Sequence, residues 1–178
     1  MNSDEQSDAP KSPVGCEFES LFFGGDLVIA VVTLNLNMNT PAIALPEQYA
    51  AWHATLPLVH IVAFKKNQWQ FYTLAELQAP TRVDKFKATN ATQLRAFVEM
   101  YRTHGATDAE GPKKTKFSLE RLAACIAIAV ENADILFTDP CDGFSMWKLR
   151  PDECAVRPLN CTILEFIAAA TVENLQVD

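Results

Sequence analysis

The sequence contains no long hydrophobic run. Its longest apolar stretches, Leu27–Val32 and Leu122–Val130, fall far short of the roughly 20 residues that a helix needs to span a bilayer. The first residues are acidic and polar, whereas a secretory signal begins with basic residues and continues with an apolar stretch. We therefore expect no membrane partner, no export and a cytoplasmic location.

Glycine is also scarce, with six residues in the chain, and the motifs of glycine-rich sites are missing. Gly24-Gly25-Asp26 lacks the spacing and the Lys-Ser/Thr pair of a phosphate-binding loop. The chain contains neither the His-Glu-x-x-His motif of zinc proteases nor the Gly-x-Ser-x-Gly motif of serine hydrolases. The sequence thus predicts no cofactor.

The metal-binding residue types form no familiar pattern either. The five cysteines are widely spaced, and no two have the two-residue spacing of a zinc knuckle; such cysteines are typical of reduced thiols in a cytosol-like compartment. The densest carboxylate group, Asp134, Asp139 and Asp142, lacks the spacing and the terminal glutamate of a calcium loop. In a strand, Asp134 and Asp139 would face opposite sides, so we predict no metal site.

What the chain does contain is enough apolar material for one domain. Of 178 residues, 49% are hydrophobic, and a domain of this size buries roughly two thirds of its unfolded surface. Residues 1–15 are rich in Ser, Asp and Pro, and we expect them to form a disordered tail. Residues 16–178 are then expected to form a single domain.

Charge is distributed unevenly, and the net charge is −7. Residues 1–64 carry 1 basic and 7 acidic side chains, residues 65–121 carry 11 and 6, and residues 122–178 carry 3 and 9. Because phosphate contacts need a positive field, we expect no nucleic-acid partner. The basic middle segment could meet an acidic partner, but no aromatic residue interleaves its lysines, which favours a solvated segment.

The apolar residues follow strand and helix periods in turn. Strand patterns cover Asp26–Asn37, Leu58–Phe64, Trp69–Tyr72, Asp134–Asp139, Phe144–Leu149 and Ala155–Leu159. Helix patterns cover Glu17–Phe23, Pro46–Ala54, Leu74–Leu77, Thr89–His104 and Thr162–Asn174. These elements predict an α+β fold in which helices flank a central, mostly antiparallel sheet.

Two stretches lie between these elements, residues 105–116 and residues 118–130. Residues 105–116 are polar and are predicted to form a mobile loop. Ser118 is a good N-cap for a helix that begins at Leu119. Leu122–Val130 fits either the continuation of that helix or a strand, because its isoleucines and its last valine alternate with alanines, and the topology depends on this choice.

Few residues suggest catalysis. Cys141 lies in a predicted turn, where an exposed thiol would be a nucleophile if a neighbouring base activated it, but the charges nearby are acidic and disfavour the thiolate. The histidines, His53, His60 and His104, would reach a cysteine or an aspartate only in an assumed geometry. We expect them to be satisfied residues of the core or of its boundary.

Several motifs together resemble the SMI1/KNR4 (SUKH) superfamily. The stretches that carry the resemblance lie within residues 45–77 and 126–170: Leu45–Trp52 (LPEQYAAW), Phe71–Leu77 (FYTLAEL), Ile126–Asp139 (IAIAVENADILFTD), Phe144–Leu149 (FSMWKL) and Val156–Ile167 (VRPLNCTILEFI). The chain departs from the family at Ala54–Leu58, where an Asn-Gly-Gly-like turn is usual. Residues 16–40 and the insert 79–116 have no obvious counterpart, so the resemblance covers about half of the chain.

The resemblance implies an α+β fold around a central sheet and a role without catalysis. Members of that superfamily commonly bind other proteins, and many bacterial members are immunity proteins that neutralise a toxin. Because the family pattern supplies no catalytic residue, none is carried over to this chain.

Three hypotheses about function follow. The first is a protein-binding module, such as an immunity protein, that meets a basic toxin through an acidic surface. The residues predicted to bind the partner are Glu131, Asp134, Asp139, Asp142, Asp152 and Glu153. The second is a small cytosolic enzyme that uses Cys141 or a histidine, assisted by an aspartate. The third is a chaperone or effector-type protein that recognises a helix through Tyr49 and Trp52, if these are exposed.

Overall fold

The computed structural model describes residues 31–34, 43–56, 61–81 and 88–172. The predicted tail 1–15 and the predicted helix Glu17–Phe23 lie outside the described residues, as does most of the predicted strand Asp26–Asn37. The part of that strand that is described is β1, Val31–Leu34, which pairs antiparallel with β2, Ile43–Pro46.

In the described residues the remaining nine strands form one sheet, in the order β11-β3-β4-β7-β8-β9-β10-β5-β6. The pairing of β10 with β5 is parallel and the other pairings are antiparallel. The strands are β3 Ile61–Phe64, β4 Asn67–Phe71, β5 Asp108–Glu110, β6 Lys116–Ser118, β7 Ile126–Glu131, β8 Asp134–Asp139, β9 Ser145–Arg150, β10 Ala155–Thr162 and β11 Thr171–Val172.

The described chain also contains five α-helices, most of which begin where the sequence supplies a start signal. They are α1 Glu47–His53, α2 Leu74–Gln78, α3 Gln93–Thr103, α4 Leu119–Ala124 and α5 Ile163–Ala169. Pro46 precedes α1, and capping boxes begin α2 (Thr73 with Glu76) and α5 (Thr162 with Glu165). Helices and a mostly antiparallel sheet confirm the predicted α+β fold.

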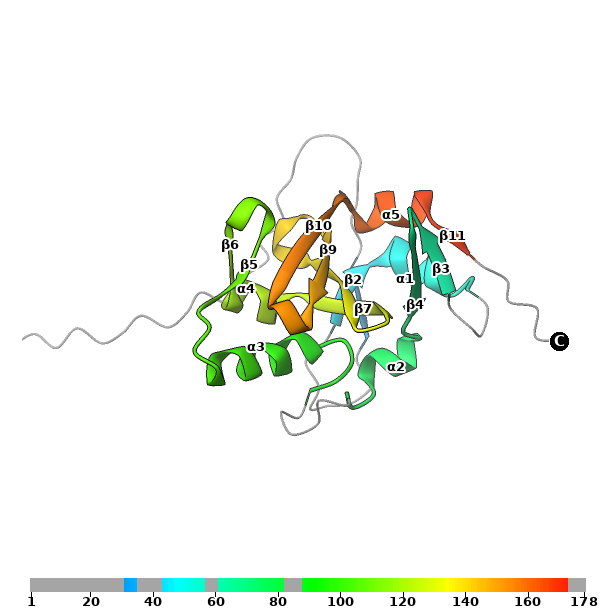
Figure 1. The fold of residues 1–178 in the computed structure, drawn as a ribbon. Coiled ribbons are helices and arrows are strands. Elements are labelled where there is room, and N and C mark those ends of the chain that lie inside the picture. The colour runs from blue at the N-terminus through cyan, green and yellow to red at the C-terminus, as the bar shows by residue number, and fades with distance from the viewer. Residues whose placement is uncertain (1–30, 35–42, 57–60, 82–87, 173–178) are drawn as a thin grey trace, which may run out of the picture.

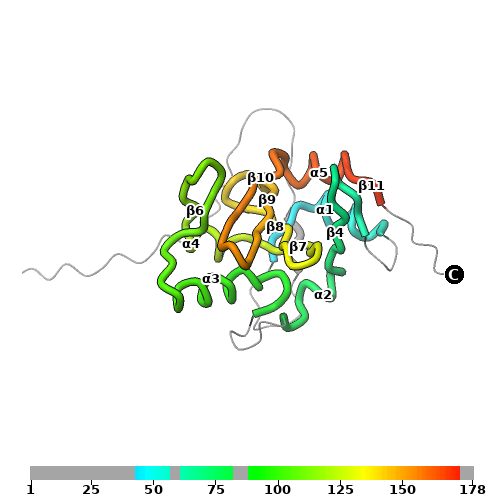
Figure 2. The backbone as a smooth tube through the Cα atoms, in the orientation of Figure 1, coloured from blue at the N-terminus to red at the C-terminus, as the bar shows by residue number. Residues whose placement is uncertain are grey.

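The sheet separates two hydrophobic cores. One core contains residues of α1, β3, β4 and α5, including Trp69, Phe71 and Phe166; the other contains residues of α3, α4, β5 and β6, including Leu94 and Leu122. Figures 1 and 2 show α3 and α4 toward one end of the molecule and α1 and α5 toward the other, with β7, β9 and β10 between them. Alternate residues of β8 therefore belong to different cores: Phe137 to that of α3, Leu136 to that of α1.

The structure corrects two predictions about boundaries. Residues 105–116 are not one loop, because Asp108–Glu110 and Lys116–Ser118 pair as a hairpin that buries Ala109 and Phe117. The C-terminal helix is shorter than Thr162–Asn174, since α5 ends at Ala169 and the chain then pairs as β11 with β3.

Leu122–Val130, which the sequence left open between helix and strand, is helix in its first part and strand in its second. The helix α4 ends at Ala124, and β7 begins two residues later at Ile126. Among the described residues, no helix has the length and apolar character that crossing a bilayer requires.

Candidate functional site

The turn between β8 and β9 is built from short-range sequence signals. Its residues Pro140–Asp142 form a single 3-10 turn. The Oδ1 atom of Asp139 accepts a hydrogen bond of 3.0 Å from the backbone N–H of Cys141, which fixes the start of the turn. Gly143 ends it with a φ of 57°, a left-handed conformation that glycine adopts without steric cost.

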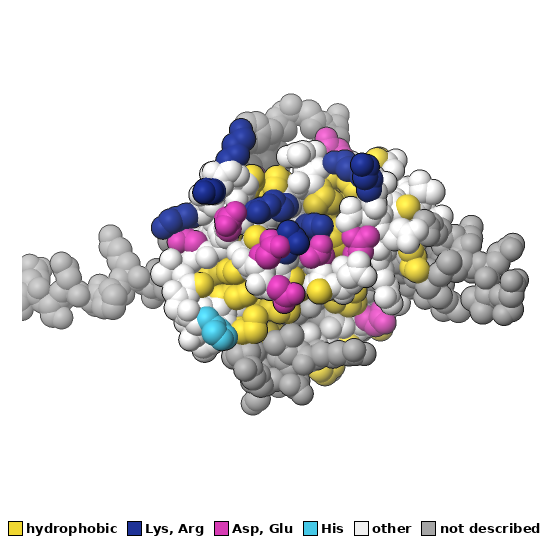
Figure 3. Space-filling view, viewed as in Figure 1, with side chains coloured by type: hydrophobic (Ala, Val, Ile, Leu, Met, Phe, Trp, Pro, Cys, Tyr) yellow, Lys and Arg dark blue, Asp and Glu magenta, His cyan; other side chains and the backbone are white. Residues whose placement is uncertain are grey.

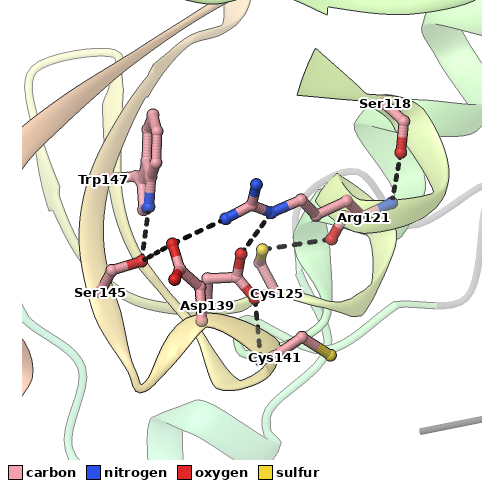
Figure 4. Close-up of polar contacts among 8 residues, drawn as sticks. Ser118, Arg121, Cys125, Asp139, Cys141, Ser145 and Trp147 are labelled. Atoms are coloured by element: carbon pink, nitrogen blue, oxygen red, sulfur yellow. Dashed lines mark hydrogen bonds and ion pairs between the residues drawn. The ribbon is translucent and has the colours of Figure 1, made fainter.

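The helix α4 brings an arginine to this turn (Figure 4). The Ser118 hydroxyl accepts a hydrogen bond of 3.1 Å from the backbone N–H of Arg121 and so caps the helix. The Arg121 side chain then reaches both aspartates of the turn. Its Nε lies 2.5 Å from Oδ2 of Asp139, and its Nη2 lies 2.9 Å from Oδ2 of Asp142.

Two aromatic rings lie against the same guanidinium. The Cζ atom of Arg121 is 4.6 Å from the ring centre of Phe117 and 5.7 Å from that of Trp147, which is within cation–π range. The indole Nε1 of Trp147 donates to the Ser145 hydroxyl (2.8 Å), which donates in turn to Asp142 (3.0 Å). We call these six residues the Arg121 cluster: Phe117, Arg121, Asp139, Asp142, Ser145 and Trp147.

The cluster runs from the core to the surface. The Asp139 side chain has no exposed surface, whereas the Arg121 side chain is 40% exposed and that of Asp142 is 57% exposed. Burial acts to lower the pKa of Arg121, but the hydrogen bond to Asp139 and the charges of both aspartates raise that pKa overall. The guanidinium therefore stays charged, and two carboxylates against one cation leave an excess of one negative charge.

This arrangement suits recognition better than proton transfer. An arginine with a raised pKa holds its proton, so it stabilises charge but does not act as a general base. The remaining groups are a partly buried indole, a hydroxyl and an exposed carboxylate, all held by one network of hydrogen bonds. Such a network presents a fixed pattern of charge and shape at the surface.

The two thiols near the cluster lie in different surroundings. Cys125 follows α4, is buried, and donates from Sγ to the backbone carbonyl of Arg121 at 3.2 Å. Burial, with a further contribution from the charge of Asp139, raises the pKa of the Cys125 thiol, which keeps it protonated. Cys141 is exposed in the turn, where Asp139 and Asp142 are the nearest charges of its own element.

The two described histidines, His53 and His104, do not lie in the Arg121 cluster. His53 is buried on α1, with Nε2 at 2.7 Å from the backbone carbonyl of Tyr72. His104 is exposed after α3, with Nδ1 at 2.8 Å from the carbonyl of Met100. His60 lies outside the described residues. Tyr49 is fully buried beside a half-buried Trp52, so the face proposed for recognising a helix is mostly part of the core.

The six acidic residues predicted to bind a partner do not form one surface. Most are already engaged by other residues: Glu131 with the Gln68 backbone N–H and the Asn67 amide, Asp134 with Lys148 (2.8 Å), Asp139 and Asp142 with Arg121, and Glu153 with Arg150 (2.7 Å). Asp152 makes no ion pair with any described residue. Figure 3 shows basic and acidic side chains interleaved on the face seen there, so that face is not uniformly acidic.

Asp139 and Asp134 of the predicted set differ in burial and in the side of β8 that they occupy. Asp139 is fully buried, so the structure excludes it from a contact surface and makes it a support for Arg121 instead. Asp134 is on the side of β8 opposite to Asp139, since it shares the side of Leu136 while Asp139 shares that of Phe137. Asp142 is the residue of the predicted set that lies exposed within the cluster.

No group of three or more His, Cys, Asp or Glu side chains in the described part of the chain has the arrangement that holds a metal ion. A shallow surface cavity of about 170 Å³ lies beside the turn and is lined by Ile43, Ala44, Ala91, Thr92, Arg95, Ala124, Cys125, Ile126 and Pro140. Its volume is below the roughly 300–1,000 Å³ of most small-molecule sites.

Sequence reasoning missed four members of the cluster: Phe117, Arg121, Ser145 and Trp147. The available signal was the cap at Ser118, because a helix starting at Leu119 places Arg121 in its first turn. The signal did not extend to the partner residues, since Arg121 and Asp139 are 18 positions apart and only the pairing of the sheet brings them together.

Comparison with known proteins adds no relative. A scan against protein-family models, a search of curated proteins and a search of solved structures each gave no match.

Proposed function

We propose that this protein is a protein-binding module without catalytic activity, and that its partner is a basic protein. The finer form of the proposal is an immunity protein that neutralises a toxin, which the resemblance to the SMI1/KNR4 (SUKH) superfamily suggests. The acidic balance of the chain, with a net charge of −7, supports a basic partner through electrostatic steering.

The observation that carries the proposal is the fixed, partly exposed pair of Arg121 and Trp147. Tryptophan and arginine are enriched among the residues that dominate binding energy at protein interfaces. Here both side chains are held before any partner arrives, Arg121 by two carboxylates and Trp147 by Ser145. Because these side chains are already ordered, association loses less conformational entropy than it would with free ones.

The sequence contains a natural control for this site. The turn between β9 and β10, Pro151–Glu153, is also a 3-10 turn that begins with proline and ends at a left-handed residue, Cys154. Its acidic residue Glu153 pairs with Arg150 three positions away, and in the described structure no aromatic ring stacks on that arginine. The two turns thus share shape and charge but differ in the arginine–aromatic stack.

The test is affinity capture from the cells that produce the protein, with three full-length baits: the wild type, Asp142→Asn and Glu153→Gln. We expect the wild type and Glu153→Gln to retain one basic protein in near-equal amounts. We expect Asp142→Asn to retain several times less of it. Capture of no protein by any bait, at expression levels at which the bait is abundant, would contradict the proposal.

A further inference from the structure

The two oxygen atoms of the exposed Asp142 carboxylate differ in their contacts. Its Oδ2 atom receives both the Arg121 Nη2 donor (2.9 Å) and the Ser145 hydroxyl (3.0 Å). Its Oδ1 atom makes no hydrogen bond with any residue that the structure describes. The carboxylate is therefore fixed through one oxygen, Oδ2, and its side chain as a whole is 57% exposed.

The charges around this oxygen favour a cation. Asp139 and Asp142 together outweigh Arg121 by one negative charge. On α4, the exposed Glu120 is paired with Arg102 at 2.9 Å and is not counted in this excess. An approaching carboxylate or phosphate would meet the excess negative charge of the cluster, whereas an ammonium or guanidinium group would neutralise it.

The aromatic part of the cluster adds a surface for the stem of such a side chain. The indole of Trp147 is partly exposed and is linked to Asp142 through Ser145. Lysine and arginine have apolar stems that pack along aromatic surface while the charged end stays polar. The Asp142 carboxylate and the Trp147 indole are thus linked through the Ser145 hydroxyl in one hydrogen-bond network.

We propose that the Arg121 cluster receives one lysine or arginine side chain of a protein partner, with its cationic end on Oδ1 of Asp142 and its stem along Trp147. This inference rests on the proposed function for the identity of the partner but not for the chemistry of the site. In this arrangement Arg121 is a positioning residue: it holds the Asp142 carboxylate, and the buried Asp139 holds Arg121.

The test uses the full chain, labelled with ¹⁵N, and two small probes at equal ionic strength. Nα-acetyl-arginine amide represents the basic side chain and Nα-acetyl-glutamate amide represents an acidic one. The readout is the NMR signal of the Trp147 indole N–H. This signal is assigned as the one that is missing from the spectrum of the Trp147→Phe variant. We expect the arginine probe to move this signal in a saturable way and the glutamate probe to leave it unchanged.

Two variants make the result specific. Asp142→Asn keeps an oxygen that can accept from Arg121 and Ser145 but removes the charge. We expect this variant to bind the arginine probe with roughly fivefold lower affinity, as for loss of an exposed ion pair. Glu153→Gln, in the matching turn, should leave the titration unchanged. The spectra of both variants also report whether the fold is intact.

The inference is overturned by no shift with the arginine probe, by an equal shift with the glutamate probe, or by an unchanged titration in Asp142→Asn. Its failure is distinguishable from failure of the proposed function. A basic protein captured equally well by wild type and Asp142→Asn would leave the function standing and remove this site. A saturable titration together with no captured protein would do the reverse.

Discussion

Arg121 and Asp139 form an ion pair in which one partner is exposed and the other is not. The Nε atom of Arg121 lies 2.5 Å from a carboxylate oxygen of Asp139, whose side chain has no exposed surface. A buried carboxylate is costly unless it is paired and hydrogen-bonded, and Asp139 has both Arg121 and the N–H of Cys141. The pair therefore joins α4 to the turn that carries the candidate site.

The first prediction concerns the stability of this pair. Arg121→Met should lower the free energy of unfolding by about 2–4 kcal/mol, because it leaves the buried charge of Asp139 without its partner. Urea-induced unfolding measures the change. Arg102→Met is the control: its side chain is 42% exposed, close to that of Arg121, but both of its partners, Glu99 and Glu120, are exposed. That variant should lose much less stability than Arg121→Met, because solvent screens an exposed ion pair. Equal losses would contradict the account.

The second prediction concerns alkaline pH. Burial raises the pKa of Cys125 above its ordinary value of 9.0. The native state therefore keeps the thiol protonated at pH values where the unfolded chain releases it. Below pH 9.0 both states keep the proton, and the thiol does not change the free energy of unfolding. Above pH 9.0 the unfolded state is increasingly favoured, and the free energy of unfolding falls by about 1.4 kcal/mol per pH unit for one proton.

Unfolding free energies measured from pH 8 upward test this directly. The Cys125→Ala variant should show a slope of the free energy of unfolding against pH that is smaller by about one proton above the onset. A Cys125→Ala profile that runs parallel to that of the wild type would show that this thiol is not protected in the native state.

The third prediction links the helix cap to the site. Ser118→Ala removes the acceptor for the Arg121 backbone N–H and should cost about 1 kcal/mol. Because the cap orients the turn of helix that carries Arg121, its effect should be non-additive with Arg121→Met by about 0.5 kcal/mol or more. Thr162→Ala, which removes the cap of α5, should be additive with Arg121→Met. A double-mutant cycle by urea unfolding distinguishes the two, and additivity in both cycles would contradict the coupling.

The fourth prediction tests the hairpin of β5 and β6. At Gly111, a Cβ atom would lie 2.5 Å from Oγ1 and 3.0 Å from the backbone oxygen of Thr115. Gly111→Ala should therefore lower the free energy of unfolding by about 1–3 kcal/mol, as overpacking does. Adding Thr115→Ala removes the nearer conflict and should recover part of the loss. An unaffected Gly111→Ala protein would be the behaviour of an open loop.

Local signals in the sequence were sufficient for much of the framework of the site. Ser118 predicted the start of a helix at Leu119, and Pro140-Cys141-Asp142-Gly143 predicted a turn between two strands; the structure confirms both. These predictions succeed because capping and turn formation depend on residues within four positions of each other.

The predictions that failed depend on contacts between distant segments. The hairpin of β5 and β6 spans residues 108–118, beyond the predicted loop 105–116, and its short strands end the sheet on one side, with Ala109 and Phe117 as buried residues. The exposure of the acidic residues also could not be derived locally. Asp139 and Asp142 are three positions apart, yet one is fully buried and the other is mostly exposed, because Asp139 ends the buried strand β8 and Asp142 lies in the turn that follows it.

The most direct measurement of the central claim is site-specific photo-crosslinking in the cells that produce the protein. A photoreactive amino acid replaces the exposed Cys141 in the turn of the Arg121 cluster, and in a second protein it replaces the exposed Asn160 on β10. We predict one crosslinked basic protein from position 141 and none from position 160. No crosslinked protein at position 141, or the same products from both positions, would contradict the account.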